Sequence, residues 1–403
     1  MLDFHSGSSS AVNTRSAVRE CLDNAFGEGG GAECSLLVIH VTMGHDFAQM
    51  AAAARDACPD AEIIGCTASG IIGREGVNEA MRAMAVMAIT GDEVAVAVLD
   101  GLNGANSAAF GEDAARQLQQ TMDGISIIYV LTAGLDLAGD RVIEGIEAVF
   151  GPEVPIFGTT SADNGKAKGT YQFHGDKIFE KSVVLVGFAD PSLEVIMGVH
   201  HGSVPLDGMT FEVTKSEDNR IIELDGKPAW PSLMSRLGLT PDAKPAEVLP
   251  IAGLGIELDP EAQVAYDNPQ ILRVPLMASD DRQSFLLPAT CPEGTKVVLM
   301  QRDEQYIFAG VDRLMDRMVG ELDGRRPLAV FHADCMARGR RMFNRVLKDE
   351  IIAKMQHPLS GEGDVVPWLG LYGYSEYCRF GGKNQFHSYT SALCPIVRRE
   401  DGS

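Results

Sequence analysis

Apolar residues in the first part of the chain form short continuous runs separated by longer stretches of helical period. The runs Leu36–Val41, Ser126–Leu131 and Val154–Phe157 have the length and the branched side chains that are typical of buried strands. The stretches between them, among them the alanine-rich Asp46–Ala57 and Ser107–Thr121, predict helices. Strands that alternate with helices in this way indicate an α/β fold.

Other apolar segments lie close together and are separated by turn residues. Met81–Ile89 and Val94–Leu99 flank a short polar turn, which predicts that they pair as a hairpin. Three consecutive strands are expected further on, at Tyr171–His174, Lys177–Phe188 and Leu193–His201. We therefore expect a mixed α+β protein in which helices flank sheets of both parallel and antiparallel strands.

The length of the chain favours more than one domain, because 403 residues exceed what one compact core usually holds. The segment Pro241–Pro250 is rich in proline and charge and is predicted to be a connector. We place the domain boundary near residue 215, which gives an N-terminal domain of residues 1–215 and a C-terminal, ligand-binding domain of residues 216–403.

Charge and composition exclude several classes of protein. A net charge of −22 argues against a nucleic-acid surface, which needs clustered Lys and Arg. No apolar run approaches the roughly 20 residues that span a bilayer, and no secretory signal is evident. The eight cysteines form no CxxC pair, so neither a zinc knuckle nor a disulfide framework is expected. A soluble, cytoplasmic protein is predicted.

Two loops rich in small residues follow the same pattern of an apolar residue, Gly, any residue, Thr and two small residues. They begin at Ile64 and Phe157. Such loops let a backbone approach a ligand closely and offer it hydroxyl groups, although they are equally typical of tight strand ends. Neither matches a Walker loop or a nucleophile elbow. The candidate ligand-binding residues in them are Cys66, Thr67, Ser69, Thr160 and Ser161.

A second group of candidates lies near the end of the chain. Cys335 is predicted at a junction of strand and helix, where free N–H groups attract anions and lower the pKa of a thiol. Arg338, one turn further, suits a ligand carboxylate, and Glu376 suits a ligand amine. Tyr374 is expected to form a wall, and His387 lies on a predicted final strand, Phe386–Leu393.

Several segments together resemble the FIST family of intracellular sensory proteins, which pair a FIST N with a FIST C domain. The resemblance rests on Gly65–Gly70, Phe157–Asp163, Val213–Ala229, Cys335–Arg338 and Gly370–Thr390. It implies the sensing of a small ligand such as an amino acid or a related metabolite. This chain has no room for a fused output domain, so a separate protein partner is implied, such as a histidine kinase or a cyclic-nucleotide signalling enzyme.

The same resemblance raises haem as a candidate cofactor, because some stand-alone FIST proteins are haem-binding nitric oxide sensors. Haem iron usually takes a His or Cys ligand. The sequence does not choose among the candidate ligands His200, His201, His332 and His387.

Two further interpretations stay open at this point. Cys335 as nucleophile, His387 as base and Glu376 as orienting acid would suit a cysteine-dependent hydrolase or transferase. No local catalytic signature accompanies them, so no catalytic residue is assigned and a non-enzymatic sensor is preferred. A scaffold that binds proteins through its acidic surface, without a small ligand, is the other alternative.

Overall fold

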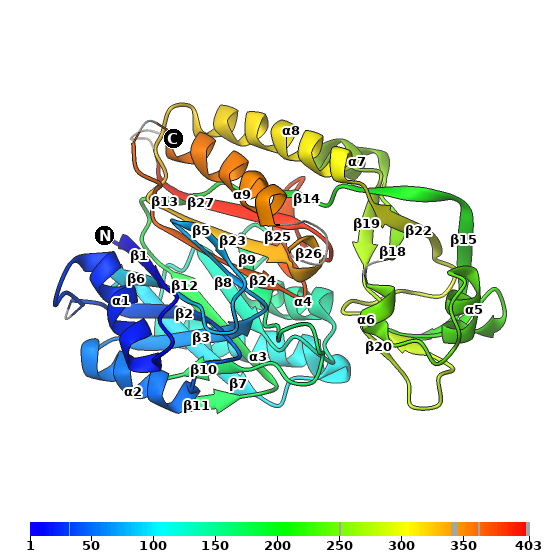
Figure 1. The fold of residues 1–403 in the computed structure, drawn as a ribbon, viewed down its shortest axis with the longest axis horizontal. Coiled ribbons are helices and arrows are strands. Elements are labelled where there is room, and N and C mark those ends of the chain that lie inside the picture. The colour runs from blue at the N-terminus through cyan, green and yellow to red at the C-terminus, as the bar shows by residue number, and fades with distance from the viewer. Residues whose placement is uncertain (32, 250, 340–344, 362, 400–403) are drawn as a thin grey trace.

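The structure is a computed structural model that describes residues 1–31, 33–249, 251–339, 345–361 and 363–399. Most of the chain folds into three sheets of the same plan, and an inserted lobe stands to one side of them (Figure 1). No helix among the described residues combines the length and the apolar character needed to span a membrane.

Each of the three sheets is formed mainly by one repeat of strand, helix, strand, helix, strand, hairpin and strand. The first repeat comprises β1 (Asp3–Ser9), α1 (Thr14–Phe26), β2 (Leu36–Thr42), α2 (Phe47–Ala57), β3 (Glu62–Ala68), the hairpin β4 (Ile71–Gly73) and β5 (Gly76–Asn78), and β6 (Met84–Thr90). The second comprises β7 (Val94–Asp100), α3 (Ser107–Thr121), β8 (Ile127–Thr132), α4 (Gly139–Phe150), β9 (Ile156–Thr160), the hairpin β10 (Gln172–His174) and β11 (Lys177–Phe179), and β12 (Ser182–Phe188). The third comprises β13 (Leu193–Val195) and β14 (Gly198–His200), α8 (Glu304–Leu322), β23 (Ala329–Cys335), α9 (Arg345–Ser360), β24 (Trp368–Gly373), the hairpin β25 (Glu376–Phe380) and β26 (Lys383–His387), and β27 (Ser391–Arg398).

Pairing within the sheets repeats as well. The second and third strands of each repeat are parallel, in the pairs β2–β3, β8–β9 and β23–β24. The hairpin of each repeat pairs with a strand of another repeat: β4 pairs with β24, β10 with β3 and β25 with β9. The three sheets are therefore joined in a ring, because every hairpin completes the sheet of a neighbouring repeat.

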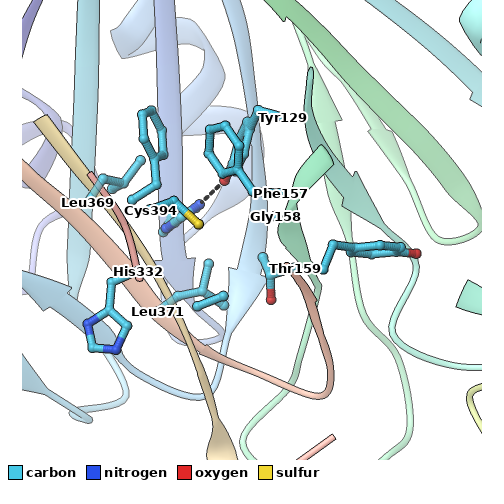
Figure 2. A pocket seen from close by; sticks show the side chains of 12 residues that line it. Tyr129, Phe157, Gly158, Thr159, His332, Leu369, Leu371 and Cys394 are labelled. Atoms are coloured by element: carbon cyan, nitrogen blue, oxygen red, sulfur yellow. Dashed lines mark hydrogen bonds between the residues drawn. The ribbon is translucent and has the colours of Figure 1, made fainter. Parts of the chain in front are cut away.

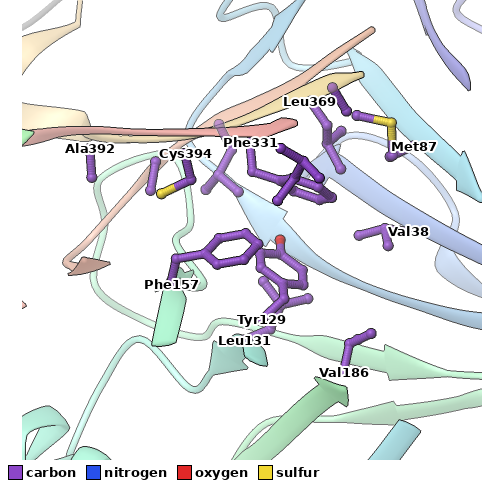
Figure 3. Packing of buried hydrophobic residues seen from close by; sticks show 14 of the residues in the cluster. Val38, Met87, Tyr129, Leu131, Phe157, Val186, Phe331, Leu369, Ala392 and Cys394 are labelled. Atoms are coloured by element: carbon purple, nitrogen blue, oxygen red, sulfur yellow. The ribbon is translucent and has the colours of Figure 1, made fainter. Parts of the chain in front are cut away.

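The inner faces of the three sheets meet in one apolar core. Val38, Tyr129 and Phe331 hold corresponding positions on the second strands and point into it (Figure 3). The ring centroids of Tyr129 and Phe331 lie 5.0 Å apart, and both rings lie 5.3 Å from the ring of Phe157. On the outer faces, the amphipathic pairs α1–α2, α3–α4 and α8–α9 bury their apolar stripes against one sheet each.

Glycine is required at one equivalent position of each repeat, because the neighbouring parallel strand passes too close for a Cβ atom. A Cβ on Gly65 would lie 2.0 Å from the carbonyl oxygen of Ile39, and one on Gly158 would lie 1.9 Å from that of Val130. At Gly370 the corresponding contact, with a backbone oxygen, is 2.8 Å and therefore less severe.

We expect Gly158→Ala to lower the free energy of unfolding by about 3 kcal/mol, because two backbones must separate to admit the methyl group. Gly370→Ala should cost less. Gly320 in α8 is the matched control: it is exposed and no atom lies near its Cβ position, so alanine there should be neutral or stabilising by up to about 1 kcal/mol. Urea unfolding of the three variants tests this order, and equal losses at residues 158 and 320 would contradict the crowding.

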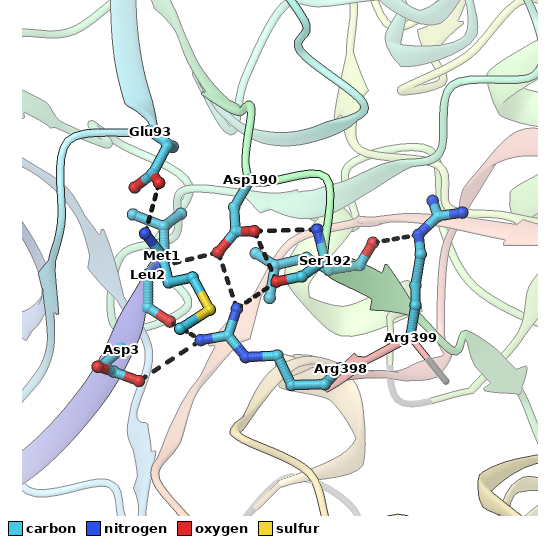
Figure 4. A network of polar contacts seen from close by, with 9 residues as sticks. Met1, Leu2, Asp3, Glu93, Asp190, Ser192, Arg398 and Arg399 are labelled. Carbon is cyan, nitrogen blue, oxygen red and sulfur yellow. Dashed lines mark hydrogen bonds and ion pairs between the residues drawn. The ribbon is translucent and has the colours of Figure 1, made fainter. Parts of the chain in front are cut away.

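The first and last strands are joined by a polar network (Figure 4). Asp190 accepts hydrogen bonds from the backbone N–H of Leu2 at 2.8 Å and of Ser192 at 3.0 Å, and from Arg398 Nη1 at 2.8 Å. Burial disfavours the charged carboxylate of Asp190, but the hydrogen bond from Ser192 Oγ at 2.6 Å, together with the three above, outweighs it and holds the pKa of Asp190 well below the ordinary value. The network ties β1 to the strand that ends the third repeat.

The inserted lobe lies between β14 and α8 and has its own core around Trp230 and Phe285. Its elements are β15 (Ser203–Glu217), β16 (Arg220–Leu224), β17 (Lys227–Pro228), α5 (Ala229–Arg236), α6 (Pro245–Val248), β18 (Gly253–Glu257), α7 (Pro260–Tyr266), β19 (Gln270–Arg273), β20 (Met277–Ala278), β21 (Phe285–Leu286) and β22 (Lys296–Arg302). A boundary at residue 215 stays a prediction; β15 crosses this position, and strands from both sides of it share sheets.

The predicted class of fold is confirmed, since helices flank mixed sheets, but one predicted pairing and two predicted strands are wrong. β6 and β7 do not form a hairpin, because each packs in the sheet of its own repeat. Lys177–Phe188 divides into β11 and β12, which belong to different sheets. Phe386–Leu393 is not one strand, because Tyr389 adopts a φ of 61° and separates β26 from β27.

Candidate functional site

The loops predicted to bind a ligand lie side by side. The backbone N–H of Ala162 donates to the carbonyl of Thr67 at 2.8 Å, and that of Ser375 donates to Thr160 Oγ1 at 2.9 Å. The two small-residue segments resemble each other because both form the end of the third strand of a repeat and the residues that follow it: Ile64–Ala68 lies in β3 and Phe157–Thr160 in β9. The predicted residues are all buried: Cys66, Thr67, Ser69, Thr160, Ser161, Cys335, Arg338, Tyr374, Glu376 and His387.

Most hydroxyl groups of these loops are hydrogen-bonded to the protein itself. Thr67 Oγ1 accepts from the N–H of Tyr171 at 2.9 Å, and Ser161 Oγ donates to the carbonyl of Thr132 at 2.8 Å. The hydroxyl of Tyr374 donates to Asp163, a residue that the candidates omitted. Asp163 also accepts from the backbone N–H groups that follow it, so it organises the loop of residues 163–168.

Glu376 and Gln172 occupy the same position in two repeats. Glu376 in β25 lies opposite Thr159 in β9, and Gln172 in β10 lies opposite Cys66 in β3. In both cases the residue begins the hairpin that completes a neighbouring sheet. The surroundings of Gln172 therefore show how a polar side chain at the start of such a hairpin finds hydrogen-bond partners.

The two side chains differ in their second polar atom. Gln172 Oε1 accepts from the N–H and Oγ of Ser182, and its Nε2 donates to Ser161 Oγ. Glu376 Oε2 accepts in the same way from the N–H and Oγ1 of Thr390, at 3.3 and 2.6 Å. Its Oε1, however, is buried and has no hydrogen-bond partner among the described residues. Buried polar atoms in native proteins normally have one.

Arg338 leaves a second buried atom without a partner. Its Nε donates to Asp334 Oδ1 at 2.9 Å and its Nη1 to the carbonyl of His201 at 2.9 Å. The side chain is 1% exposed, and within the described part of the chain Nη2 has no acceptor. The guanidinium is thus fixed in orientation, while one of its donors stays available.

His387 and Tyr266 complete the surroundings of Glu376. His387 lies opposite Glu376 on β26, so the two side chains share one face of the hairpin. His387 Nε2 bonds to the carbonyl of Cys378 at 3.0 Å, and its ring centroid is 5.5 Å from that of Tyr266. Tyr266 also stacks on Phe380, with centroids 4.6 Å apart. The inserted lobe thereby covers this face.

Seven of the buried side-chain polar atoms without a described partner belong to residues from the lobe and from the sheet elements near it. They are Glu376 Oε1, Arg338 Nη2 and His387 Nδ1 from the sheets, and the Tyr266 hydroxyl, Asn268 Oδ1, Gln270 Oε1 and Arg273 Nε from the lobe. We call these residues the junction cluster. Its lobe members carry no sequence motif, so only their burial identifies them.

The junction cluster borders an open cleft. Gln270 lines a surface cleft of about 520 Å³, together with Gly255 and Lys296. The backbone carbonyl of Gln270 also accepts a hydrogen bond from His201 Nε2 at 2.9 Å. His201 in turn accepts a hydrogen bond from Arg338 through its own carbonyl, so His201 links Gln270 to Arg338. The residues that line this cleft all belong to the inserted lobe, and Gln270 is the member of the junction cluster among them.

Another cavity lies at the centre of the three sheets (Figure 2). Its volume is about 10 Å³, enough for about one water molecule. His40 Nε2 bonds to the Tyr129 hydroxyl at 3.0 Å beside it, and burial lowers the pKa of His40 to about 3. The space is too small for a metabolite, which needs about 300 Å³ or more.

Burial raises the pKa of Glu376 well above its ordinary value, and the nearby Asp334 adds to this, against the hydrogen bonds from Thr390. The folded protein therefore holds this proton more tightly than the unfolded chain. The resulting stability is fully present below the unfolded pKa of about 4.3 and is lost as pH rises above it, by up to about 1.4 kcal/mol per pH unit.

Glu376→Gln should remove this pH dependence of the free energy of unfolding. The fold should tolerate glutamine here, because Gln172 occupies the same position in another repeat. We expect the variant to exceed wild type in free energy of unfolding by about 2 kcal/mol near pH 7, and to show a smaller slope between pH 5 and pH 8. Urea titrations across this range measure it. The exposed Glu28→Gln serves as control, and a slope equal in both variants would show that Glu376 is ionised in the fold.

The predicted activation of Cys335 is wrong. Cys335 is the last residue of β23 and is followed by a short 3-10 turn, Met336–Arg338, so its thiol lies in the interior rather than at an open helix end. Burial raises the pKa of this thiol, and the nearby Glu376 adds to the effect. The described hydrogen bonds of Cys335 and His387 lead to the carbonyls of Tyr374 and Cys378, not to each other.

The four candidate haem ligands do not fit a haem group. All are buried, and His332 borders only the central cavity of about 10 Å³. The Nε2 atoms of His201, His332 and His387 are bonded to Gln270, Ser391 and Cys378, respectively. His200 Nε2 has no hydrogen-bond partner among the described residues, but the His200 ring packs against Gly310 of α8 and beside Tyr306, and burial lowers the pKa of His200 well below the ordinary value.

Sequence comparison identifies the class of protein. The FIST N domain matches residues 35–227 and the FIST C domain matches residues 233–379. The chain therefore belongs to the FIST family, whose domains are generally sensory, ligand-binding domains.

Two relatives match this chain over almost its whole length. Two uncharacterised proteins from two strains of Mycobacterium tuberculosis are each 24% identical over 97% of this chain and 98% of their own length. Among solved structures, a cyanuric acid hydrolase is similar with a TM-score of 0.35 and 11% identity, covering 99% of this chain and 100% of that one. PurLQS from Thermotoga maritima gives a TM-score of 0.23 at 8% identity, over 99% of this chain and 73% of its own. Likenesses this weak carry no functional argument.

Proposed function

We propose that this protein is a sensor that binds a small zwitterionic metabolite, such as an amino acid, at the junction cluster. The observation that carries the proposal is the gathering of unpartnered buried polar atoms between lobe and sheets. An unsatisfied buried group costs about 1–3 kcal/mol, so a ligand that pairs with several of them gains affinity from groups that are already oriented.

The chemistry of the cluster favours a ligand with both a carboxylate and an ammonium group. The Nη2 of Arg338 offers a fixed donor to a carboxylate. Glu376 Oε1 offers an acceptor to an ammonium group, whose charge would favour the ionised carboxylate. Binding should therefore release a proton from Glu376. The small-residue segment at Thr160 holds the start of the β25 hairpin, because Thr160 Oγ1 accepts from the N–H of Ser375, the residue before Glu376.

Binding between the lobe and the sheets would link ligand occupancy to the position of the lobe. We propose that a separate signalling protein detects this change, and the family resemblance favours a histidine kinase or a cyclic-nucleotide signalling enzyme as that partner. Measuring kinase autophosphorylation with ligand-free and ligand-loaded protein tests this step.

A thermal-shift screen tests the binding step. Amino acids form one arm, and the matching organic acids and amines, each with only one charged group, form the others. A zwitterion present at 100 times its Kd should stabilise the protein by about 2.7 kcal/mol, and the single-charge analogues much less. Stabilisation by none of the amino acids would contradict the proposal.

A further inference from the structure

A second cleft is lined by residues of both the inserted lobe and the second repeat. Its volume is about 320 Å³, which is within the range of small-molecule sites. The second repeat contributes Lys166 and Ala167, from the loop that follows β9, and the lobe contributes residues beside α6 and from β20 and the turn after it. None of the lining residues belongs to the junction cluster.

The charge of this cleft is opposite to that of the chain as a whole. Three cations line it, those of Lys166, Lys244 and Arg282, against one carboxylate, that of Asp280. The chain has a net charge of −22, and the cleft of about 520 Å³ in the lobe shows the reverse balance, with three carboxylates and one lysine. Cations that gather in a concave site focus a positive potential there, which favours an anionic occupant.

The three cations are available to a ligand. In the described part of the chain, none of them forms an ion pair. The neighbouring carboxylates accept other hydrogen bonds: Glu247 Oε2 accepts from the backbone N–H of Lys244 at 2.6 Å, and Asp281 Oδ1 accepts from Ser279 Oγ at 2.6 Å.

The segments that carry the cations are held in place. The buried Asp163 accepts from the backbone N–H groups of Lys166 at 2.7 Å and Lys168 at 2.9 Å, which fixes one wall. On the other wall, Arg282 Nη1 donates to the carbonyl of Ala243 at 3.1 Å. The described residues supply no acceptor for Nε or Nη2 of Arg282, so both can donate to a ligand.

We propose that this cleft is a second binding site, independent of the junction cluster, for a small soluble ligand that carries phosphate groups. Phosphate oxygens point in tetrahedral directions, so both walls can contact one group, and the Arg282 fork suits two of the oxygens. No aromatic side chain is among the lining residues that the structure describes, and Pro245 and Met277 form an apolar wall. An aliphatic body therefore suits the cleft better than a nucleobase, and an occupant would hold the lobe against the second repeat.

Calorimetric titration of the full chain with pyrophosphate, at constant ionic strength and without metal ions, tests the site. We expect one saturable site per chain with a Kd in the millimolar range or tighter, and binding of malonate that is weaker by at least about 10-fold. Absence of saturable pyrophosphate binding, or equal binding of the dicarboxylate, would overturn the proposal.

Variants of both walls locate the binding. Lys166→Ala and Arg282→Gly should each weaken the Kd for pyrophosphate by about 10-fold or more. Residue 282 has a φ of 57°, which glycine adopts more easily than arginine, so the second variant should keep its fold. Lys177→Ala removes an exposed lysine of β11, outside the cleft, and should leave the Kd unchanged. An unchanged Kd in both folded cleft variants would place the anion elsewhere and contradict the proposal.

Vesicles of phosphatidylcholine with phosphatidic acid distinguish a soluble ligand from a lipid headgroup. The net charge of −22 should keep the chain off these anionic vesicles. Co-sedimentation with them that is lost in Lys166→Ala would identify a headgroup as the ligand and overturn the assignment of a soluble one.

Discussion

Replacing Arg338 by methionine is expected to lower the free energy of unfolding by about 3–5 kcal/mol. The substitution leaves the carboxylate of Asp334 buried without the guanidinium that accompanies it at 2.9 Å. It also removes the Nη2 donor, so binding of a carboxylate ligand should be lost. Urea unfolding and calorimetric titration measure the two effects separately.

The double variant Asp334→Asn/Arg338→Met is the matched control. Without the buried charge, most of the lost stability should return, since a buried ion pair replaced as a whole costs little. Ligand binding should not return. A single Arg338→Met variant as stable as wild type would mean that water reaches Asp334, contrary to its 2% exposure.

Phe331→Ala is expected to cost about 3–5 kcal/mol, because this ring lies where all three sheets meet. It contacts the rings of Phe4, Tyr129 and Phe157, so removal leaves a cavity that three different strands would have to fill. Phe331→Leu, which keeps most of the volume, should cost clearly less.

The control for this position is Ile178→Ala, since Ile178 is 42% exposed on a short hairpin strand. We expect a change within about 0.5 kcal/mol there. A loss below 1 kcal/mol for Phe331→Ala, measured by urea unfolding, would be inconsistent with a shared central core.

Local pattern was sufficient to predict most helices and many strands. α3 begins and ends at the predicted residues, and α2 begins one residue later than predicted, because apolar stripes and caps are local features. The mixed fold class follows from the same alternation.

Pairing could not be predicted in the same way. β4 and β10 have three residues each, and such short strands carry no signal for a partner that belongs to another repeat. The turn between β6 and β7 has hairpin-like residues, yet the two strands belong to separate sheets. The inserted lobe also interrupts the third repeat, which hides the repetition in the sequence.

The candidate site was found in part. Arg338, Glu376 and His387 were predicted from residue type and family resemblance; Glu376 and His387 lie opposite each other on β25 and β26, and a binding role for the three residues stays a prediction. Tyr266, Asn268, Gln270 and Arg273 were missed, because polar residues in a segment without a motif look like an ordinary surface. The thiol of Cys335 was misjudged, since the apolar run ends at Phe331 whereas the strand continues for four more residues and ends with the buried Cys335.

The most direct test of a ligand site at the junction cluster is calorimetric titration of the amino acid that stabilises the protein most. The titration is run with wild type and with Asp334→Asn/Arg338→Met, in two buffers of different ionisation enthalpy. We expect one site per wild-type chain, proton release on binding, and at least a 100-fold weaker Kd in the double variant. An unchanged Kd in a folded double variant would show that the ligand binds elsewhere.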